Sequence, residues 1–187
     1  MGVWIALAVG AVVVLLVIWK YNSIISHRNQ VDNAFGSMDA MLKQRYDLIP
    51  NLVSTVQTYV QHERGVLEEL TALRTRAASA DLSAEEHADL DGKTTHALSA
   101  LRVAVENYPD LKANRNFLQL QASLNEVEEK VGAARRNYNR AVTDYNTAIE
   151  SFPGSLMAAR MHLQRKPVFE IVETERHAPD VKAVFNG

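Results

Sequence analysis

Few combinations of residues in this sequence could carry out chemistry, and each of them is incomplete. Asp91 to Thr95 contains Gly-Lys-Thr, which ends a phosphate-binding loop, but that loop also needs a glycine five residues before Gly92, where His87 stands. His87 and Asp91 can share one helical face, although a single pair of this kind is more often a solvated contact than a site. The motif therefore does not predict nucleotide binding.

The sequence also lacks the residue patterns of metal sites and of cysteine nucleophiles. No two of the six histidines are four residues apart, and none follows a glutamate by three residues, the spacing that di-iron helical bundles use. The chain has no cysteine, which excludes disulfides, thiolate metal sites and cysteine catalysis. A net charge of −2 gives no basic surface for nucleic acid. We predict that the protein is not an enzyme and has no cofactor, no metal and no nucleic-acid partner.

Arg45 is the most informative polar residue, because it interrupts an apolar helical seam. A buried guanidinium must find carboxylates or carbonyls, or its burial is strongly unfavourable. One interpretation is a structural ion pair with a nearby carboxylate: Asp47, Asp144 or Glu128. The other is that Arg45, Asp47, Pro50 and Asn51 form a polar notch that binds a partner. The seam residues around Arg45 recur in steps of three and four: Val31, Phe35, Met38, Leu42, Ile49, Leu52, Val56 and Tyr59.

Residues 1–20 are predicted to be a membrane anchor. No charged side chain occurs before Lys20, and a helix over this stretch would be roughly 28 Å long, close to the ~30 Å hydrocarbon thickness of a bilayer. Trp4 and Trp19 lie near its two ends, where aromatic rings prefer the headgroup region. A cleaved signal peptide is the alternative, but the segment lacks a basic N-terminal region.

Two further features of this segment concern its orientation and its packing. Lys20 and Arg28 follow the apolar stretch, which favours a cytoplasmic position for the rest of the chain. Gly2, Ala6 and Gly10 are four residues apart, a stripe that would let two spans approach closely, although small residues are also common in any span.

Residues 21–166 are predicted to fold as an elongated antiparallel bundle of three long helices and one short helix. The first helix continues the span and runs to residue 69, with a bend at Pro50 because proline breaks one backbone hydrogen bond. Ser83 and Glu86 form a capping box that begins the second helix, and Pro109 ends it. Residues 155–165 make the short helix, and residues 167–187 are a partly extended tail. The predicted fold class is all-α.

The third long helix has the most regular pattern in the chain. It ends at Pro153-Gly154, and it carries Tyr138-Asn139 and Tyr145-Asn146 one heptad apart. Such tyrosines usually pack in a seam with the hydroxyl at a polar edge, and the asparagines could fix the register between helices. The predicted seam residues are Phe117, Leu120, Leu124, Val127, Val131, Ala134, Tyr138, Ala141, Tyr145, Ala148 and Phe152.

Several long segments share a recognisable family pattern. They are Tyr21–Phe35 (YNSIISHRNQVDNAF), Leu42–Glu63 (LKQRYDLIPNLVSTVQTYVQHE), Tyr108–Asn146, which ends in NYNRAVTDYN, and the KPVFE run at 166–170. With these segments the chain resembles the LemA family of bacterial membrane-anchored helical proteins. Met161-His162 departs from a Gly-Phe pattern expected near the fourth helix. The resemblance implies a span followed by an elongated helical bundle, and it supplies no catalytic or cofactor residues.

These features together predict a non-enzymatic scaffold at the bacterial plasma (inner) membrane, single-pass, that self-assembles through its bundle and shapes or organises the membrane. A narrow bundle about 50 Å long has much lateral surface, and anchoring many copies in one plane raises their effective concentration. The alternative is an adaptor that presents the notch at Arg45 to a membrane protease or another envelope protein. The expected partners are the lipid bilayer and other copies of the chain and, in the alternative, that protease or envelope protein.

Overall fold

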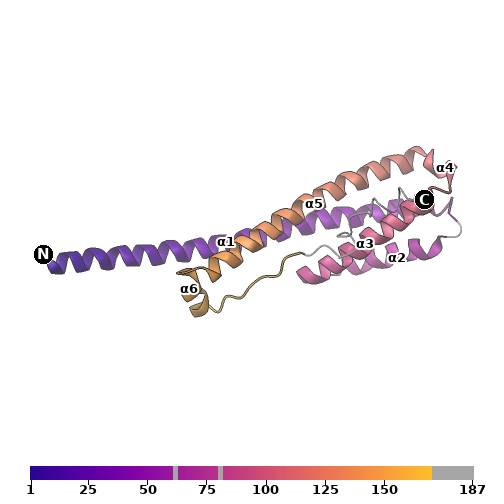
Figure 1. The fold of residues 1–187 in the computed structure, drawn as a ribbon. Helices are drawn as coiled ribbons and strands as arrows, with labels where there is room; N and C mark the ends of the chain where they lie inside the picture. Colours follow the sequence, from indigo (N-terminus) through magenta and orange to yellow (C-terminus); the bar gives the residue numbers. More distant parts are fainter. Residues whose placement is uncertain (61–62, 80–81, 170–187) are drawn as a thin grey trace, which may run out of the picture. The chain divides into compact units, whose positions relative to one another are not determined.

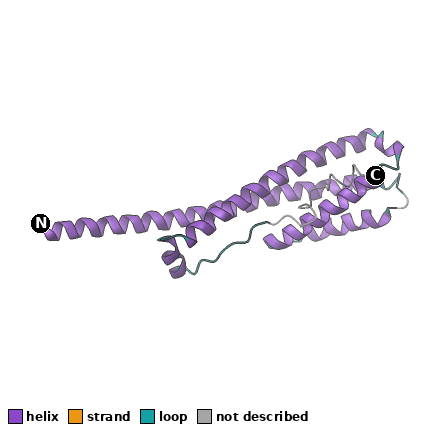
Figure 2. Ribbon diagram, viewed as in Figure 1, coloured by secondary structure: helices purple, strands orange, loops and turns teal. Residues whose placement is uncertain are grey.

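The computed structural model describes residues 1–60, 63–79 and 82–169, and these residues are largely helical (Figure 1). Figure 2 shows helices joined by loops, with no strand among the described residues, so the all-α prediction is confirmed. Residues 170–187, most of the predicted tail, lie outside the described part of the chain. The helices are α1 Gly2–Val56, α2 Arg64–Ala77, α3 Ala84–Val105, α4 Pro109–Lys112, α5 Arg115–Glu150 and α6 Gly154–Arg160.

Helix α1 joins the apolar N-terminal stretch to the rest of the chain without a break. It is 55 residues long and passes through Gly36 and Pro50. Its seam faces the protein interior, as predicted, and the buried members are Val31, Met38, Leu42, Ile49, Leu52 and Val56. The predicted end at residue 69 is wrong, because α1 ends at Val56.

A tight turn after Val56 begins the return of the chain. The Tyr59 amide donates to the Val56 carbonyl at 2.9 Å, and the Thr58 hydroxyl donates to the Thr55 carbonyl at 3.1 Å. Helix α2 then packs against α3 and buries one leucine stripe: Leu67, Leu70 and Leu73. Burial of each leucine contributes ~1.5–3 kcal/mol, which favours a separate helix here over a longer α1.

The extra helix changes the direction of α3. Because α2 lies between them in the chain, α1 and α3 run parallel: Asp39 lies beside His87, and further along both helices Arg45 lies beside Asp91. The predicted bundle of three long helices and one short helix, all antiparallel, is therefore wrong in helix number and in this pairing. The predicted capping box is present at the start of α3, where the Ser83 hydroxyl accepts from the Glu86 amide at 3.2 Å.

Packing divides the described residues into two compact units. One contains Met1–Met38 and Ala134–Val168, and the other contains Asp39–Ala133 and Phe169. Helices α1 and α5 contribute residues to both. Within the first unit these two helices are antiparallel. The Phe35 and Tyr138 rings lie 5.9 Å apart, and Lys20 approaches Gly154, which also packs against the Ala148 carbonyl near the end of α5.

Helix α6 is shorter than the predicted helix over residues 155–165. After Arg160 the Leu163 amide donates to the Ala158 carbonyl at 3.0 Å and the His162 amide to the Ala159 carbonyl at 3.4 Å. This is a Schellman motif, and His162 occupies its left-handed position with φ of 53°, where glycine is usual. The helix therefore stops, and the chain continues without helix through residues 163–169.

The prediction that Phe152 belongs to the seam of the third long helix is wrong. Its side chain is 81% exposed, because α5 already ends at Glu150 and the chain turns there. Most other members of the seam are buried in α5 as predicted: Phe117, Leu124, Val127, Val131, Tyr138, Ala141, Tyr145 and Ala148.

Candidate functional site

Arg45 and Asp91 form a buried ion pair in the second unit. The Arg45 Nη2 atom lies 2.5 Å from Asp91 Oδ1, and the two side chains are 1% and 2% exposed. Arg45 also donates to the Asp91 carbonyl at 3.2 Å and to the Thr95 hydroxyl at 3.1 Å. The guanidinium therefore has a carboxylate partner, but it is none of the three predicted ones. The sequence reasoning missed Asp91 because it expected no parallel packing of α3 on α1.

The surroundings of this pair are polar but enclosed. His87 is buried, and its Nε2 atom lies 3.6 Å from Asp39 Oδ1, so the solvated contact expected for His87 and Asp91 is wrong. The Arg45 guanidinium lies 5.8 Å from the centre of the Tyr46 ring. Burial raises the pKa of the Tyr46 phenol above its usual value, while the Arg45 charge partly opposes the rise.

This arrangement stabilises structure more readily than it performs chemistry. In the described part of the chain, no three histidine, aspartate or glutamate side chains are placed to hold a metal ion. Gly92 and Lys93 lie inside α3, so Gly-Lys-Thr forms part of a helix and not a phosphate-binding loop. A guanidinium held by a carboxylate, a carbonyl and a hydroxyl is not available to a partner at the surface.

The residues of the predicted notch are divided between two faces of α1. Arg45 points into the protein, whereas Asp47, Pro50 and Asn51 are exposed. Asp47 pairs with Lys43 at 3.1 Å on that outer face, one helical turn away. The exposed three residues form a surface, but Arg45 is not part of it.

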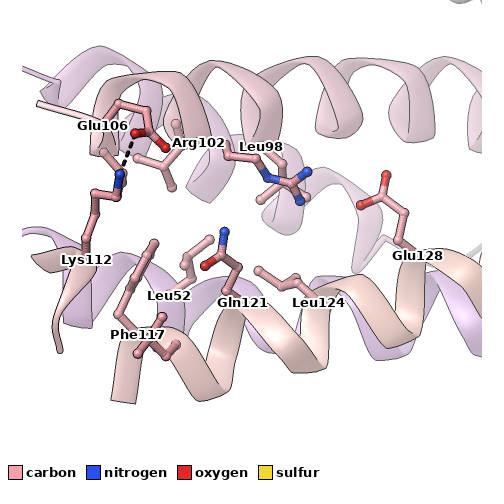
Figure 3. Close-up of a pocket in the computed structure, with 12 residues that line it drawn as sticks. Leu52, Leu98, Arg102, Glu106, Lys112, Phe117, Gln121, Leu124 and Glu128 are labelled. Atoms are coloured by element: carbon pink, nitrogen blue, oxygen red, sulfur yellow. Dashed lines mark hydrogen bonds and ion pairs between the residues drawn. The ribbon is translucent and has the colours of Figure 1, made fainter. Parts of the chain in front are cut away.

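A small cavity in the second unit was not foreseen from the sequence. Its volume is about 100 Å³, and Leu52 of α1 lines it together with residues of α3 to α5. Figure 3 shows Phe117, Gln121 and Leu124 projecting from α5 into this space, with the Lys112–Glu106 ion pair at one end. Its lining is mainly apolar and offers no nucleophile with a base, so the cavity is an incompletely filled part of the helix packing.

Three side chains of the two tyrosine–asparagine pairs, Tyr138, Tyr145 and Asn146, hold an extended segment in the first unit. The Tyr138 hydroxyl donates to the Pro167 carbonyl at 3.3 Å, and the Tyr145 hydroxyl donates to the Gln164 carbonyl at 3.2 Å. Asn146 makes two bonds to the backbone of Lys166, of 2.9 and 3.0 Å. These polar groups therefore fasten the chain after α6 onto α5. The tyrosine rings are buried in the seam as predicted, and Tyr138 contacts Phe35 of α1, but Asn146 bonds to the Lys166 backbone and not to another helix.

Lys166 and Asn139 also lie in this region. The Lys166 ammonium lies 2.5 Å from Asp32 of α1 and 5.9 Å from the centre of the Tyr145 ring. Burial raises the pKa of Tyr145, with smaller opposed effects from Arg28 and Asp32. Asn139 is partly exposed, and its carbonyl accepts from the Thr143 hydroxyl at 2.8 Å. The extended segment thus contacts both α5 and α1.

The apolar start of α1 is exposed along its whole length. Its most apolar stretch is long enough to cross a membrane, and none of that stretch is buried by the protein. Trp4 and Trp19 are exposed at its ends, and no other residue lies within contact distance of a Cβ added at Gly10. A core helix of a soluble protein would bury such a surface, so these residues require another apolar environment.

The chain is similar in sequence to several known proteins. Protein LemA of Metamycoplasma hominis is 26% identical over 167 residues, covering 89% of this chain and 76% of that protein. Magnetosome protein MamQ 2 of Paramagnetospirillum magneticum is 22% identical over 176 residues, covering 81% of this chain. Magnetosome protein MamQ of Magnetospirillum gryphiswaldense is 21% identical over 175 residues. The chain spans 65% and 64% of the length of these two magnetosome proteins.

None of these relatives is named for an enzymatic activity. Together with the exposed apolar part of α1, they indicate a membrane-associated protein. The sequence model of the LemA family matches residues 34–183, which is well over half of the chain. The chain therefore belongs to the LemA family.

Proposed function

We propose that this protein is a non-enzymatic, membrane-anchored scaffold whose helical domain self-assembles at the bacterial inner membrane. The observation that carries the proposal is the continuity of α1, which runs from the exposed apolar stretch directly into the packed helices. A 55-residue helix is ~82 Å long, so one element reaches from the bilayer deep into the domain. Each copy would therefore present its helices to its neighbours in the same orientation.

Anchoring in one plane favours association between such copies. Two molecules held in a membrane meet at a high effective concentration, so weak contacts between helix flanks are enough for assembly. Repeated identical contacts close into a ring or continue as a lattice, depending on the rotation between neighbours. Such an assembly would organise the membrane beneath it. The relatives named for the magnetosome are compatible with an organising role of this kind.

The mass of the purified full-length protein tests the proposal. The protein is extracted in detergent, and light scattering with the micelle subtracted gives the number of copies. A discrete large oligomer supports the scaffold. A monomer or dimer, found both in detergent and after cross-linking in native membranes, would rule out self-assembly as the function.

The domain after the span is proposed to be cytoplasmic, in a protein that crosses the membrane once. Lys20 and Arg28 support this orientation. Because the chain has no cysteine, a single cysteine at Ser79, which is exposed, can be labelled selectively. An impermeant thiol reagent should label it only after the cells are opened. Labelling in intact cells would contradict this orientation and would place the domain outside the cytoplasm.

A second candidate function is an adaptor for a membrane protease or another envelope protein. The observation in its favour is the exposed surface at Asp47, Pro50 and Asn51, in one of the segments that resemble the family. The double variant Asp47→Lys, Asn51→Lys should then remove the partner from cross-linked complexes and leave the copy number unchanged. The scaffold proposal predicts instead that the purified protein forms large assemblies without any partner.

A further inference from the structure

The exposed apolar side chains of the described residues are not spread evenly. Outside the span, the large ones are Tyr21, Val103, Leu118, Phe152, Leu156 and Val168. Single exposed apolar residues are normal on a protein surface. Phe152 and Leu156, however, are 81% and 66% exposed, and Phe152 comes just before α6 while Leu156 lies in its first turn.

Helix α6 begins beside the end of the span within the first unit. A Cβ on Gly154 would overlap the carbonyl oxygen of Ala148 and lie 2.8 Å from the Lys20 Cε atom. Gly154 and Ala158 are buried, so this face of α6 is turned toward the rest of the unit. Figure 1 shows α6 beside α1.

Lys20 marks the boundary of the hydrocarbon, because it is the first charged residue after the apolar stretch. The headgroup region beyond that boundary is about 5–7 Å thick on each side of a bilayer. Because Gly154, the first residue of α6, lies beside Lys20, the helix begins at the depth of that region. Tyr21, exposed and next to Lys20, is a residue type that prefers the same depth.

The charge on α6 fits this location as well. Arg160 lies in its last turn and is exposed, and the helix carries no acidic residue in its first turn. Interfacial segments typically combine Phe or Leu facing the acyl chains with Arg or Lys facing anionic headgroups. A seven-residue helix would bind a membrane weakly by itself, but the span holds it at the surface permanently.

We infer that α6 is a second membrane contact, in which Phe152 and Leu156 insert into the headgroup region beside the span and Arg160 faces anionic lipid. The lipid surface is the occupant that this position favours, because Gly154, which lies between Phe152 and Leu156 in the chain, packs beside Lys20 at the end of the span. The inference rests on the membrane anchoring in the proposed function, but not on self-assembly. It would fix the tilt of the first unit relative to the bilayer.

Site-directed spin labelling of the full-length protein in phosphatidylcholine–phosphatidylglycerol vesicles tests this inference. The native chain has no cysteine, so each variant carries one label. The test positions are Phe152→Cys and Leu156→Cys, both exposed, so that labelling does not disturb the core. Trp19→Cys at the end of the span and Arg140→Cys on an exposed part of α5 are the matched references.

The measurement compares collisions of each label with oxygen, which dissolves in lipid, and with a water-soluble nickel chelate. Labels at 152 and 156 should favour oxygen, as at position 19, while position 140 should favour nickel. If positions 152 and 156 resemble position 140 while position 19 is in lipid, α6 lies in water and the inference fails although the anchor stands. If position 19 also favours nickel, the anchor itself fails.

A second copy of the chain is the competing occupant. In that case the labels at 152 and 156 would be shielded from both reagents and would show dipolar broadening between copies. Dilution with unlabelled protein would then remove the broadening. That outcome would overturn the lipid assignment and would place the patch in an interface between copies.

Discussion

Arg45 of α1 and Asp91 of α3 lie 2.5 Å apart with almost no exposure to solvent, and they join two helices that α2 separates in the chain. The pair is completed by the Asp91 carbonyl and the Thr95 hydroxyl. Each charge compensates the other inside the protein. Removing only one member of the pair should therefore lower the free energy of unfolding.

Asp91→Ala should destabilise the protein by about 3–5 kcal/mol, because it leaves the Arg45 charge buried without its carboxylate. Denaturant unfolding of detergent-solubilised protein, followed by circular dichroism, measures the loss. Asp47→Ala is the matched control, since the Asp47–Lys43 pair is exposed and should be worth less than about 1 kcal/mol. The double variant Arg45→Met, Asp91→Leu should recover most of the stability. If Asp91→Ala and Asp47→Ala lowered the stability equally and only slightly, the ion pair of Arg45 would have no structural role.

Asn146→Ala should release the extended segment from α5 and leave the helices in place. The change removes two hydrogen bonds to the Lys166 backbone, at a cost of about 1–3 kcal/mol in local stability. Hydrogen exchange of the peptide containing Lys166 measures the opening directly. Asn137→Ala on the exposed side of α5 is the control and should leave this exchange unchanged. Unaltered protection in Asn146→Ala would mean that other contacts hold the segment.

His162→Gly should stabilise the end of α6, by up to about 1 kcal/mol. His162 is held in the left-handed region, where a side chain is strained, whereas glycine adopts this conformation readily. The gain is limited because glycine also gives the unfolded chain more freedom. His162→Val, with a branched side chain, should have the opposite effect. Thermal unfolding of the two variants and the parent provides the comparison, and a lower midpoint for glycine than for valine would contradict the strain argument.

Tyr46 should make the fold sensitive to alkali. Burial raises its folded-state pKa above the usual value of 10.0, so the neutral phenol is the form that the fold prefers. Its contribution is present below that usual value and is lost as the pH rises from there through the folded-state pKa. Tyr46→Phe keeps the ring and removes the ionisation, so its stability should fall less between about pH 9 and pH 11 than that of the parent. Denaturant midpoints at each pH provide the test, and parallel curves would be the contrary result.

The sequence by itself determined the features that depend on local pattern. The uncharged stretch before Lys20, the apolar seams of α1 and α5, and the capping box at Ser83 each follow from residue type and spacing, and the structure contains all of them. The family could be identified at the same stage, because most residues of its conspicuous segments lie in α1 and α5. Such signals come from neighbours in the chain and need no knowledge of what packs against them.

Tertiary structure alone decided where each seam finds its partner. The burial of Leu67, Leu70 and Leu73 against α3 favours a separate α2, and this turns α3 parallel to α1 and brings Asp91 to Arg45. Long-range contacts likewise bring Tyr145 and Asn146 to a non-helical segment, 19 and 20 residues later in the chain. Heptad spacing predicts that a helix has an apolar face. It does not predict which other part of the chain, helical or not, packs against that face. That choice depends on long-range packing, which residue spacing does not encode.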